Sequence, residues 1–330
     1  MPTLNDIAQR AGVSTSSASR AFREGTSITP EVRERVLQAA RELGYTPNLL
    51  ARSLKSSRSN LIGVDVCNIE NPFYALIIKS MENELKKHGY QLVLSYSNGD
   101  PKVERKNLEL FVGMQAMGVV FMPLARKNMD TVRLLKKRGV ALIQLFNRAY
   151  DFVDTISVLD DQGAYLAAKH ILQHGHRQIL LLNVDTPFSS DRADGYRRAF
   201  QELGIPLDER YIRTVNPANL SSQDVEALLT ELAPTAVIAG VYDLGKKFLT
   251  ACRALHYRVP EDISFVAFDD VEWPELMDIT AVSQPMEYLG LTAVRMLLDR
   301  INGSIDMNQP VSTIVEPKLN LRSSVKTLRR

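Results

Sequence analysis

The sequence predicts a small N-terminal all-α helix-turn-helix domain followed by a larger α/β body built on parallel sheets. Residues 1–46 hold three short helical patterns punctuated by Gly and Pro, whereas residues 61–330 alternate strand-length apolar runs with amphipathic helices. Residues 47–60 are polar and form the expected hinge and linker. At 330 residues the chain is too long for one ordinary core, which agrees with more than one domain.

The first two helical patterns are short and lie close together. Thr3 and Asp6 form a capping-box pair ahead of the first helix, and Gly12 ends that helix because Gly adopts the left-handed conformation at no steric cost. Ser14 then caps a second helix, Thr15–Phe22. A turn this tight between two helices is typical of a helix-turn-helix unit.

A third helix braces the first two. It starts at Thr29-Pro30, with Pro at the first helical position, and Gly44 ends it. Its expected inner stripe is Val32, Val36, Leu37, Ala40 and Leu43.

The second helix exposes small hydroxyl side chains followed by an arginine, a face that has no use in packing. In a helix-turn-helix unit this helix enters the major groove, where Arg20 can donate two hydrogen bonds to guanine. Residues 1–60 also carry a net charge of +4 against −2 for the rest, which suits contact with a polyanion. The alternative is a three-helix domain without a ligand. The candidate DNA contacts here are Thr3, Ser14, Thr15, Ser16, Ser19, Arg20 and Arg23.

The body consists of repeated β-α patterns, which imply parallel sheets with helices on both faces. The expected strands are Leu61–Val66, Gln91–Ser95, Gly118–Met122, Ala141–Phe146, Gln178–Asn183, Ala236–Ala239 and Ser264–Phe268. The expected helices include Phe73–His88, Lys102–Met114, Ala164–His174, Asp191–Leu203 and Pro285–Ile301. Ligands of such folds bind outside the carboxyl ends of the strands.

Polar and aromatic residues follow the first expected strand of the body. Asn71 can cap the next helix, which Pro72 starts, and Phe73 and Tyr74 can then stack on a sugar or a base. The alternative is a helix cap with two core aromatic side chains.

The chain resembles the lactose-repressor/galactose-repressor (LacI/GalR) family along nearly its whole length. The motifs that carry the resemblance are Asp6-Ile7-Ala8, Ala11-Gly12-Val13-Ser14, Ser19-Arg20 and Leu43-Gly44-Tyr45-x-Pro47-Asn48-x-x-Ala51-Arg52-x-Leu54. The resemblance implies that Thr15, Ser16 and Arg20 read bases. It also implies a hinge in which Asn48, Ala51 and Leu54 contact DNA, with Leu54 as a wedge in the minor groove.

The resemblance extends to the body and implies a periplasmic-binding-protein-like (type I) fold. Lobe 1 is expected at about 61–159 and 286–320, lobe 2 at about 160–285, and residues 321–330 as a C-terminal tail. Arg192 and Asp269 lie where the family binds its effector, and Arg148 is a weaker candidate. The chain departs from the family at Val241-Tyr242, where Tyr242 adds an aromatic wall, so the effector need not be a common hexose. The effector-binding candidates are Asn71, Phe73, Tyr74, Arg148, Arg192, Tyr242 and Asp269.

The resemblance further implies the partners: operator DNA with palindromic symmetry, a sugar-like or sugar-acid effector, and a second copy of the chain. The segment Phe73–His88 belongs to the region that pairs subunits in the family, and the C-terminus has no apolar heptad for tetramers. The operator, the sign of the effector's action and a phosphoprotein co-regulator stay open.

Two other classes of protein compete with this interpretation. An enzyme is disfavoured because there is no Gly-x-Gly-x-x-Gly, Walker lysine loop or nucleophile elbow, and we expect no cofactor. His170 and His174 have the spacing of metal ligands, but cationic side chains also suit a helix C-terminus, and we expect no metal. A solute-binding transport protein is opposed by the polar N-terminus and the basic first domain. Two cysteines far apart and no long apolar run predict a cytosolic protein with no membrane segment.

Overall fold

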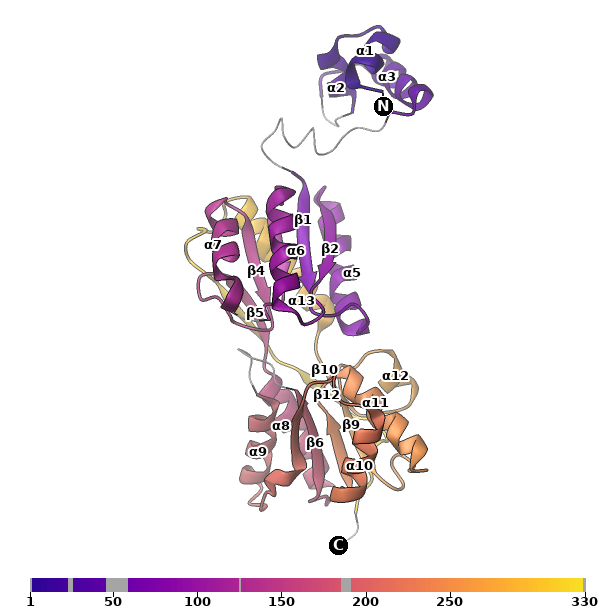
Figure 1. Cartoon of the computed structure of the whole chain (residues 1–330), viewed down its shortest axis with the longest axis vertical. Coiled ribbons are helices and arrows are strands. Elements are labelled where there is room, and N and C mark those ends of the chain that lie inside the picture. The colour runs from indigo at the N-terminus through magenta and orange to yellow at the C-terminus, as the bar shows by residue number, and fades with distance from the viewer. Residues whose placement is uncertain (1, 23–25, 46–58, 125, 185–190, 329–330) are drawn as a thin grey trace. The chain divides into compact units, whose positions relative to one another are not determined.

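The computed structural model describes residues 2–22, 26–45, 59–124, 126–184 and 191–328. The chain forms two compact units, Met1–Ser59 and Asn60–Arg330, which are described separately (Figure 1).

The described residues of the first unit form three helices whose ends follow the predicted capping residues. They are α1 (Leu4–Ala11), α2 (Thr15–Ala21) and α3 (Pro30–Leu43). The capping box before α1 is present, because the Thr3 N–H donates to Asp6 Oδ2 at 2.7 Å and the Thr3 hydroxyl accepts from the Asp6 N–H. Gly12 and Gly44 end α1 and α3 with φ of 66° and 64°.

The core of this unit is small and rich in alanine. Its buried side chains are Ile7, Ala8, Ala11, Ala18, Ala21, Val36, Ala39 and Ala40. The predicted stripe of α3 was partly wrong: Leu43 is 39% exposed, whereas Ala39 is buried. The buried face of α3 runs through residues 36, 39 and 40, and Leu43 lies in the last turn of the helix.

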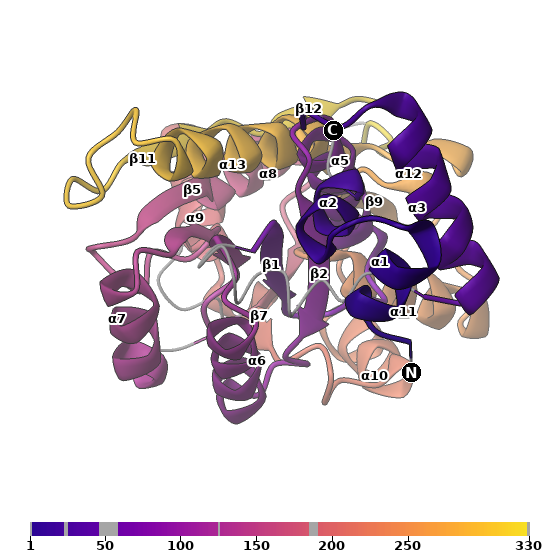
Figure 2. The same cartoon turned by 90° about the horizontal axis from the view of Figure 1, so that it is seen from above.

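Lobe 1 of the second unit contains a six-stranded parallel sheet with the order β11-β5-β4-β3-β1-β2. The strands are β1 (Leu61–Val66), β2 (Gln91–Tyr96), β3 (Gly118–Phe121), β4 (Ala141–Leu145), β5 (Asp154–Val158) and β11 (Ser312–Val315). The helices are α5 (Pro72–Lys87), α6 (Pro101–Gly113), α7 (Met129–Lys137) and α13 (Met286–Ile301). Figure 2 shows α5 and α13 on one face of this sheet and α6 and α7 on the other.

Lobe 2 contains a second six-stranded sheet with the order β12-β10-β9-β8-β6-β7, in which only β12 runs antiparallel to its neighbour. The strands are β6 (Ile179–Val184), β7 (Ile212–Val215), β8 (Ala236–Ala239), β9 (Ser264–Phe268), β10 (Ala281–Ser283) and β12 (Lys318–Asn320). The helices are α8 (Asp160–Gln173), α9 (Arg192–Glu202), α10 (Ser222–Leu232), α11 (Tyr242–Ala254) and α12 (Glu272–Leu276). Helices α8 and α9 cover one face, and α10 and α11 the other.

The chain passes between the lobes three times: from β5 to α8, from β10 to α13, and from β11 to β12. The predicted end of lobe 1 near residue 320 was therefore too late, because β12 pairs with β10 in the second sheet. The segment expected to be a tail is also bound to lobe 2. Ser324 Oγ donates to the Phe265 carbonyl at 2.6 Å, and the Leu328 N–H donates to the His174 carbonyl. The polar sequence after residue 320 hid this edge segment, which is held largely through its backbone.

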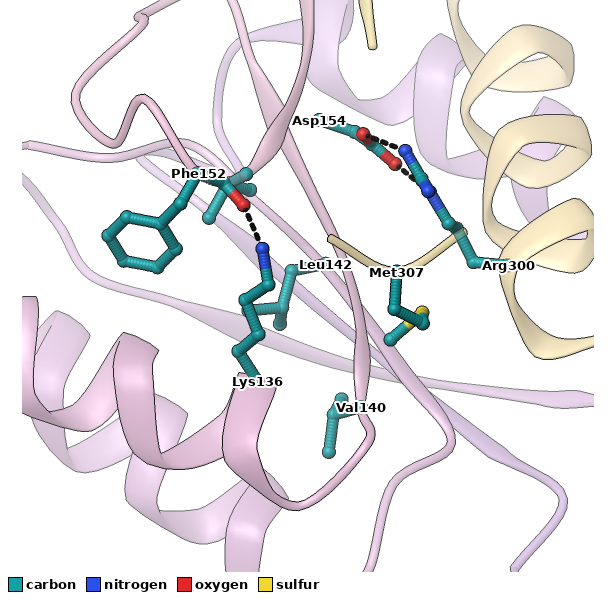
Figure 3. Close-up of a pocket in the computed structure, with 8 residues that line it drawn as sticks. Lys136, Val140, Leu142, Phe152, Asp154, Arg300 and Met307 are labelled. Atoms are coloured by element: carbon teal, nitrogen blue, oxygen red, sulfur yellow. Dashed lines mark hydrogen bonds and ion pairs between the residues drawn. The ribbon is translucent and has the colours of Figure 1, made fainter. Parts of the chain in front are cut away.

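A buried ion pair fastens the end of α13 to the start of β5. Arg300 makes two hydrogen bonds to Asp154, Nε to Oδ2 at 2.7 Å and Nη2 to Oδ1 at 2.6 Å, and both side chains are at most 5% exposed (Figure 3). The Val311 N–H also donates to Asp154, so the pair holds the segment that leads into β11. A bidentate buried pair of this kind fixes the mutual position of three segments.

Candidate DNA-reading and effector sites

The N-terminus of α2 presents its hydroxyl groups in a fixed arrangement. Ser14 caps the helix by accepting from the Ser17 N–H at 3.1 Å, and its Oγ lies 2.9 Å from Ser16 Oγ. Thr15 Oγ1 donates to Asn5 Oδ1 of α1, and Arg20 Nε donates to the Ser16 carbonyl. Thr3, Ser14, Thr15, Ser16 and Arg20 are exposed and Ser19 is half-buried. The face predicted to contact DNA is thus a polar surface at the start of one helix. Arg23, Asn48, Ala51 and Leu54 lie outside the described residues.

The effector candidates in lobe 2 form a buried charged cluster. Arg192 at the start of α9 lies 3.0 Å from Asp160 at the start of α8, measured from Nη2 to Oδ2, and its guanidinium lies 5.0 Å from the centre of the Phe268 ring. Asp269 follows β9 directly and has φ of 64°, the left-handed region. Arg192, Asp160 and Asp269 are 5%, 8% and 4% exposed. The helix starts and the strand end therefore bring three charges together at one edge of the sheet.

Two N–H groups of Arg192, at Nε and Nη1, are buried and have no hydrogen-bond partner among the described residues. The side-chain oxygen of Gln284 is likewise buried and unpaired within the described part of the chain. Leaving a buried donor unpaired costs about 1–3 kcal/mol, more for a charged group, so such groups need an explanation. A bound molecule with oxygen acceptors would satisfy Arg192, and a hydroxyl could also donate to Gln284.

Asp269 is held from two sides. Its Oδ1 accepts from Gln284 Nε2 at 2.9 Å, and its Oδ2 accepts a long hydrogen bond from the Tyr242 N–H at 3.4 Å. Burial raises the pKa of Asp269 to about 6, with Asp160 adding to the rise and Arg192 opposing it. Burial likewise raises the pKa of Asp160. A polar ligand that donates to these carboxylates would favour their ionised forms.

Aromatic side chains from both lobes surround the charged cluster. Asn71 caps α5 by accepting from the Phe73 N–H at 3.0 Å, and Phe73 is buried with its ring 5.5 Å from that of Phe146 and 5.3 Å from that of Tyr74. Tyr74, Phe146 and Tyr242 all pack, half-buried, against the core of lobe 1. Since Tyr242 starts α11 of lobe 2, this packing joins the two lobes beside Asp269. The structure thus brings together all the effector candidates except Arg148.

Arg148 lies apart from the other effector candidates in the structure. Its side chain is exposed and lies 3.6 Å from Asp151 in a surface ion pair. The chain turns sharply after β4, because Phe146 has φ of 65° and the Asn147 side chain donates to the Pro123 carbonyl. This turn places the ring of Phe146, rather than Arg148, beside Phe73.

Three residues of the cluster were missed in the sequence. Asp160 and Gln284 lie at the first and second crossings between lobes, and Phe146 directly follows β4. Asp160 offered a signal, since an acid at the start of a helix that follows a strand is a common ligand position, but neither Gln284 nor Phe146 stands in a motif. The His170 and His174 rings lie 4.4 Å apart, and burial lowers the pKa of His170 to about 4. Within the described ranges, no group of three or more His, Cys, Asp or Glu residues could hold a metal ion.

Lobe 1 also holds two fully buried acids, Asp65 on β1 and Glu104 on α6. Asp65 Oδ1 accepts from Ser95 and from Asn107, both at 2.7 Å, and Glu104 Oε2 accepts from the Leu124 N–H. The other oxygen of each acid has no partner in the described part of the chain. Burial raises the pKa of Glu104 to about 7, and the charge of Asp65 adds to the rise. At neutral pH one of the two acids is therefore expected to carry a proton.

This pair predicts a fall in stability with rising pH. The folded pKa of Glu104 lies above its ordinary value of 4.5, so its contribution is fully present below pH 4.5 and is lost as pH rises through about 7. A folded pKa that lies one pH unit above the unfolded pKa corresponds to about 1.4 kcal/mol of unfolding free energy. We expect Glu104→Gln to flatten the decline in unfolding free energy between pH 5 and 8. Glu109→Gln, which changes an exposed acid of the same helix, should leave the decline intact. An unchanged slope in E104Q would contradict the assignment.

The comparisons with known proteins agree with this architecture. Residues 3–48 match the family model for bacterial regulatory proteins of the lacI family, and residues 168–325 match a periplasmic binding protein-like domain. The HTH-type transcriptional repressor PurR of Erwinia tasmaniensis is 30% identical over 333 residues, which cover 98% of this chain and 97% of that protein.

Solved structures match along almost the whole chain. The complex of the transcriptional regulator CelR with cellobiose has a TM-score of 0.70 at 27% identity and covers 98% of this chain and 100% of that one. The Lac repressor dimer bound to operator and the anti-inducer ONPF has a TM-score of 0.78 at 24% identity, covers 98% and 99% of the two chains, and supports the fold alone.

A helix-turn-helix domain joined to a two-lobe body of this fold defines a class of DNA-binding transcription regulators rather than enzymes. The chain belongs to the lacI family of bacterial regulatory proteins. No described helix is long and apolar enough to cross a membrane.

Proposed function

We propose that this protein is a cytoplasmic repressor that binds a palindromic operator as a homodimer and releases or tightens it when a small molecule binds beside Arg192. The observation that carries the proposal is the buried Arg192 with two unpaired N–H groups next to Asp269. Three of the buried side-chain polar atoms that lack a partner among the described residues belong to Arg192 and Gln284, which lie where both lobes meet. The polar face of α2 supplies the DNA-binding half of the proposal.

The effector that fits this cluster carries hydroxyl groups and an apolar face. Hydroxyls can accept from Arg192 and donate to Asp269 or Gln284, and the rings of Tyr74, Phe146 and Tyr242 favour a flat or apolar surface. Arg192 is already paired with Asp160, and it is the one cation among the described residues of the cluster. A carboxylate on the ligand would therefore have to share Arg192 with Asp160. A neutral sugar or nucleoside-like molecule therefore fits better than a sugar acid.

Apolar side chains exposed on both lobes support the dimer. Lobe 1 exposes Ile69, Leu76, Leu94 and Tyr96, at 42–48%, around α5 and the edge strand β2. Lobe 2 exposes Leu276 at 84% and Met277 at 53%. Burying such surfaces against a second copy removes apolar area from water and would give the two DNA-binding units a twofold axis.

Binding at the cluster can be coupled to the angle between the lobes. Asp160 and Gln284, which hold Arg192 and Asp269, lie at the first and second crossings of the chain. A ligand that ties these groups together favours one lobe angle, which in a dimer sets the separation of the two hinges. Coupling free energies of this kind are typically about 1–3 kcal/mol.

Two assays on the full-length protein test the proposal. A melting-temperature panel of sugars, sugar acids and nucleosides should find a stabilising compound, and a gel shift on DNA upstream of the protein's own gene should respond to that compound. A ligand without DNA binding would favour a solute-binding protein, and a turnover product would favour an enzyme.

Arg20→Ala tests the DNA-binding face. We expect a loss of about 1–3 kcal/mol in binding to the specific site, with relaxed preference at one base pair. Arg35→Ala removes an exposed charge from α3 instead and should weaken specific and non-specific complexes alike. Fluorescence anisotropy on operator variants measures both. If both variants lost the same affinity for specific and non-specific DNA, Arg20 would not be a base-reading residue.

A further inference from the structure

The backbone at Asp269 is held in a conformation that it would not adopt freely. Its φ of 64° lies in the left-handed region, which a residue other than Gly keeps only where the surrounding structure holds it. The strand β9 ends at the preceding residue, and the Val271 N–H donates back to the Asp269 carbonyl at 2.7 Å. This tight turn points the side chain of Asp269 toward Arg192 and that of Asp270 elsewhere.

Asp270 is anchored on the other side of the turn by Arg322. The two form a bidentate pair, Nη1 to Oδ1 at 2.9 Å and Nη2 to Oδ2 at 3.0 Å, with side chains 16% and 7% exposed for Arg322 and Asp270. Asn320 donates to the same carboxylate at 2.6 Å. Arg322 also donates to the Ile279 carbonyl, and its backbone N–H donates to Thr280 Oγ1. Arg322 therefore ties the turn to the start of β10 and to the end of β12.

We propose that Arg322 is a positioning residue for effector binding, because its pair with Asp270 holds the adjacent Asp269 in the left-handed turn that aims its carboxylate at Arg192. Arg322 lies outside the charged cluster and acts through Asp270 alone. The proposal rests on the proposed role of Asp269 in binding the effector. Its test needs no ligand, so the two can fail separately.

The position of Arg322 adds a third connection between the cluster and the crossings of the chain. Asp160 and Gln284 lie at the first two crossings, and β12, which Arg322 follows by two residues, begins directly after the third. The first two joining segments are thus bonded to Arg192 and to Asp269, and the strand that follows the third is bonded to Asp270. A shift of the turn is thereby transmitted to the returning strand.

The pH dependence of the melting temperature reports where the Asp269 carboxyl lies. In the turn it is buried beside Arg192 of α9 and Asp160 of α8, with Gln284, the Tyr242 N–H and the Asn71 side chain of lobe 1 as its other partners, and its pKa is about 6. Stability linked to its protonation is lost as pH rises from about 4 through 6. The difference in melting temperature between wild type and Asp269→Asn should therefore change across this window. Glu104 titrates in both proteins, so its contribution cancels in the difference between their melting temperatures.

Arg322→Met should remove this pH-dependent change in the melting-temperature difference. Without its anchor the turn relaxes, the carboxyl reaches solvent and its pKa returns toward the ordinary value, so R322M and R322M/D269N should give parallel pH profiles. Asp270→Asn should act in the same way, and D270N/R322M should add nothing to either single variant. The acrylamide quenching of Trp273, the only tryptophan in the sequence and three residues beyond Asp270, should rise about twofold in both single variants.

Arg300→Met is the matched control, because Arg300–Asp154 is an equally bidentate buried pair at another edge of the body. It should lower the melting temperature at every pH while keeping the Asp269-dependent change and the quenching of Trp273 at wild-type values. The proposal is overturned if R322M folds and keeps that change. If R322M does not fold, the same measurement is made on D270N and on Arg322→Lys. A D270N variant that keeps the Asp269-dependent change with pH overturns the proposal equally.

Discussion

Replacing Arg192 with methionine is expected to abolish the response to the effector while leaving operator binding intact. Methionine keeps much of the apolar stem that packs near Phe268 but removes the two unpaired donors and the partner of Asp160. A hydrogen bond to a charged group contributes about 1.5–3 kcal/mol, so losing two of them should weaken ligand binding by about 10²–10⁴-fold. We therefore expect the stabilising compound from the melting panel to give no shift in R192M at concentrations that saturate the wild type.

Two controls separate loss of binding from loss of folding. Arg198→Met removes a neighbouring arginine of α9 that pairs with Asp161 at the surface, and it should keep the full ligand response. Operator affinity without ligand, measured by fluorescence anisotropy, should be close to wild type in both variants. A normal ligand shift in R192M would place the effector elsewhere and remove the observation on which the proposed function rests.

Replacing Arg300 with methionine is expected to be the most destabilising single change considered. Among the described residues it leaves the buried Asp154 with only the Val311 N–H to accept from, and breaking one side of a buried ion pair typically costs about 3–5 kcal/mol. It also frees the end of α13, which Arg300 fastens to β5 and to the Gln309 carbonyl. Urea unfolding followed by circular dichroism measures the loss.

The matched control is Arg258→Met, which breaks an exposed pair with Asp262 whose net contribution solvent screening keeps small. The double change Arg300→Met with Asp154→Leu should recover part of the stability of R300M, because no unpaired charge is then buried. A loss in R300M no larger than in R258M would show that the Arg300–Asp154 pair contributes little.

Local sequence chemistry predicted most of the elements. Caps such as Thr3 and Ser14 and the stops Gly12 and Gly44 act within one helix turn, so they could be read directly. The apolar strands β1, β8 and β9 matched their predicted ranges because their burial on both faces leaves a continuous apolar run. Strands β5, β7, β10, β11 and β12 were missed because polar side chains such as Asp154, Arg213 and Lys318 interrupt their short apolar pattern.

The effector cluster could be predicted only where a motif marks it. Arg192, Asp269 and the Asn71–Tyr74 turn stand in recognisable sequence contexts, and the structure gathers them. Gln284 and Arg322 could not be found in this way, since their roles depend on the second and third crossings, whose partners lie 15 and 52 residues away in sequence. The sequence could not show that the backbone at Phe146 turns the side chain of Arg148 outward, into a surface pair with Asp151.

The most direct test of the account is a titration of the full-length dimer on DNA from upstream of its own gene, with and without the compound that stabilises the body. The account predicts that the protein binds a palindromic site as a dimer in a single binding transition. It also predicts that the compound shifts the apparent Kd by about 5–150-fold in the wild type and leaves the Kd of R192M unchanged. A chain that remains monomeric, or a wild-type Kd that the bound compound leaves unchanged, would contradict it.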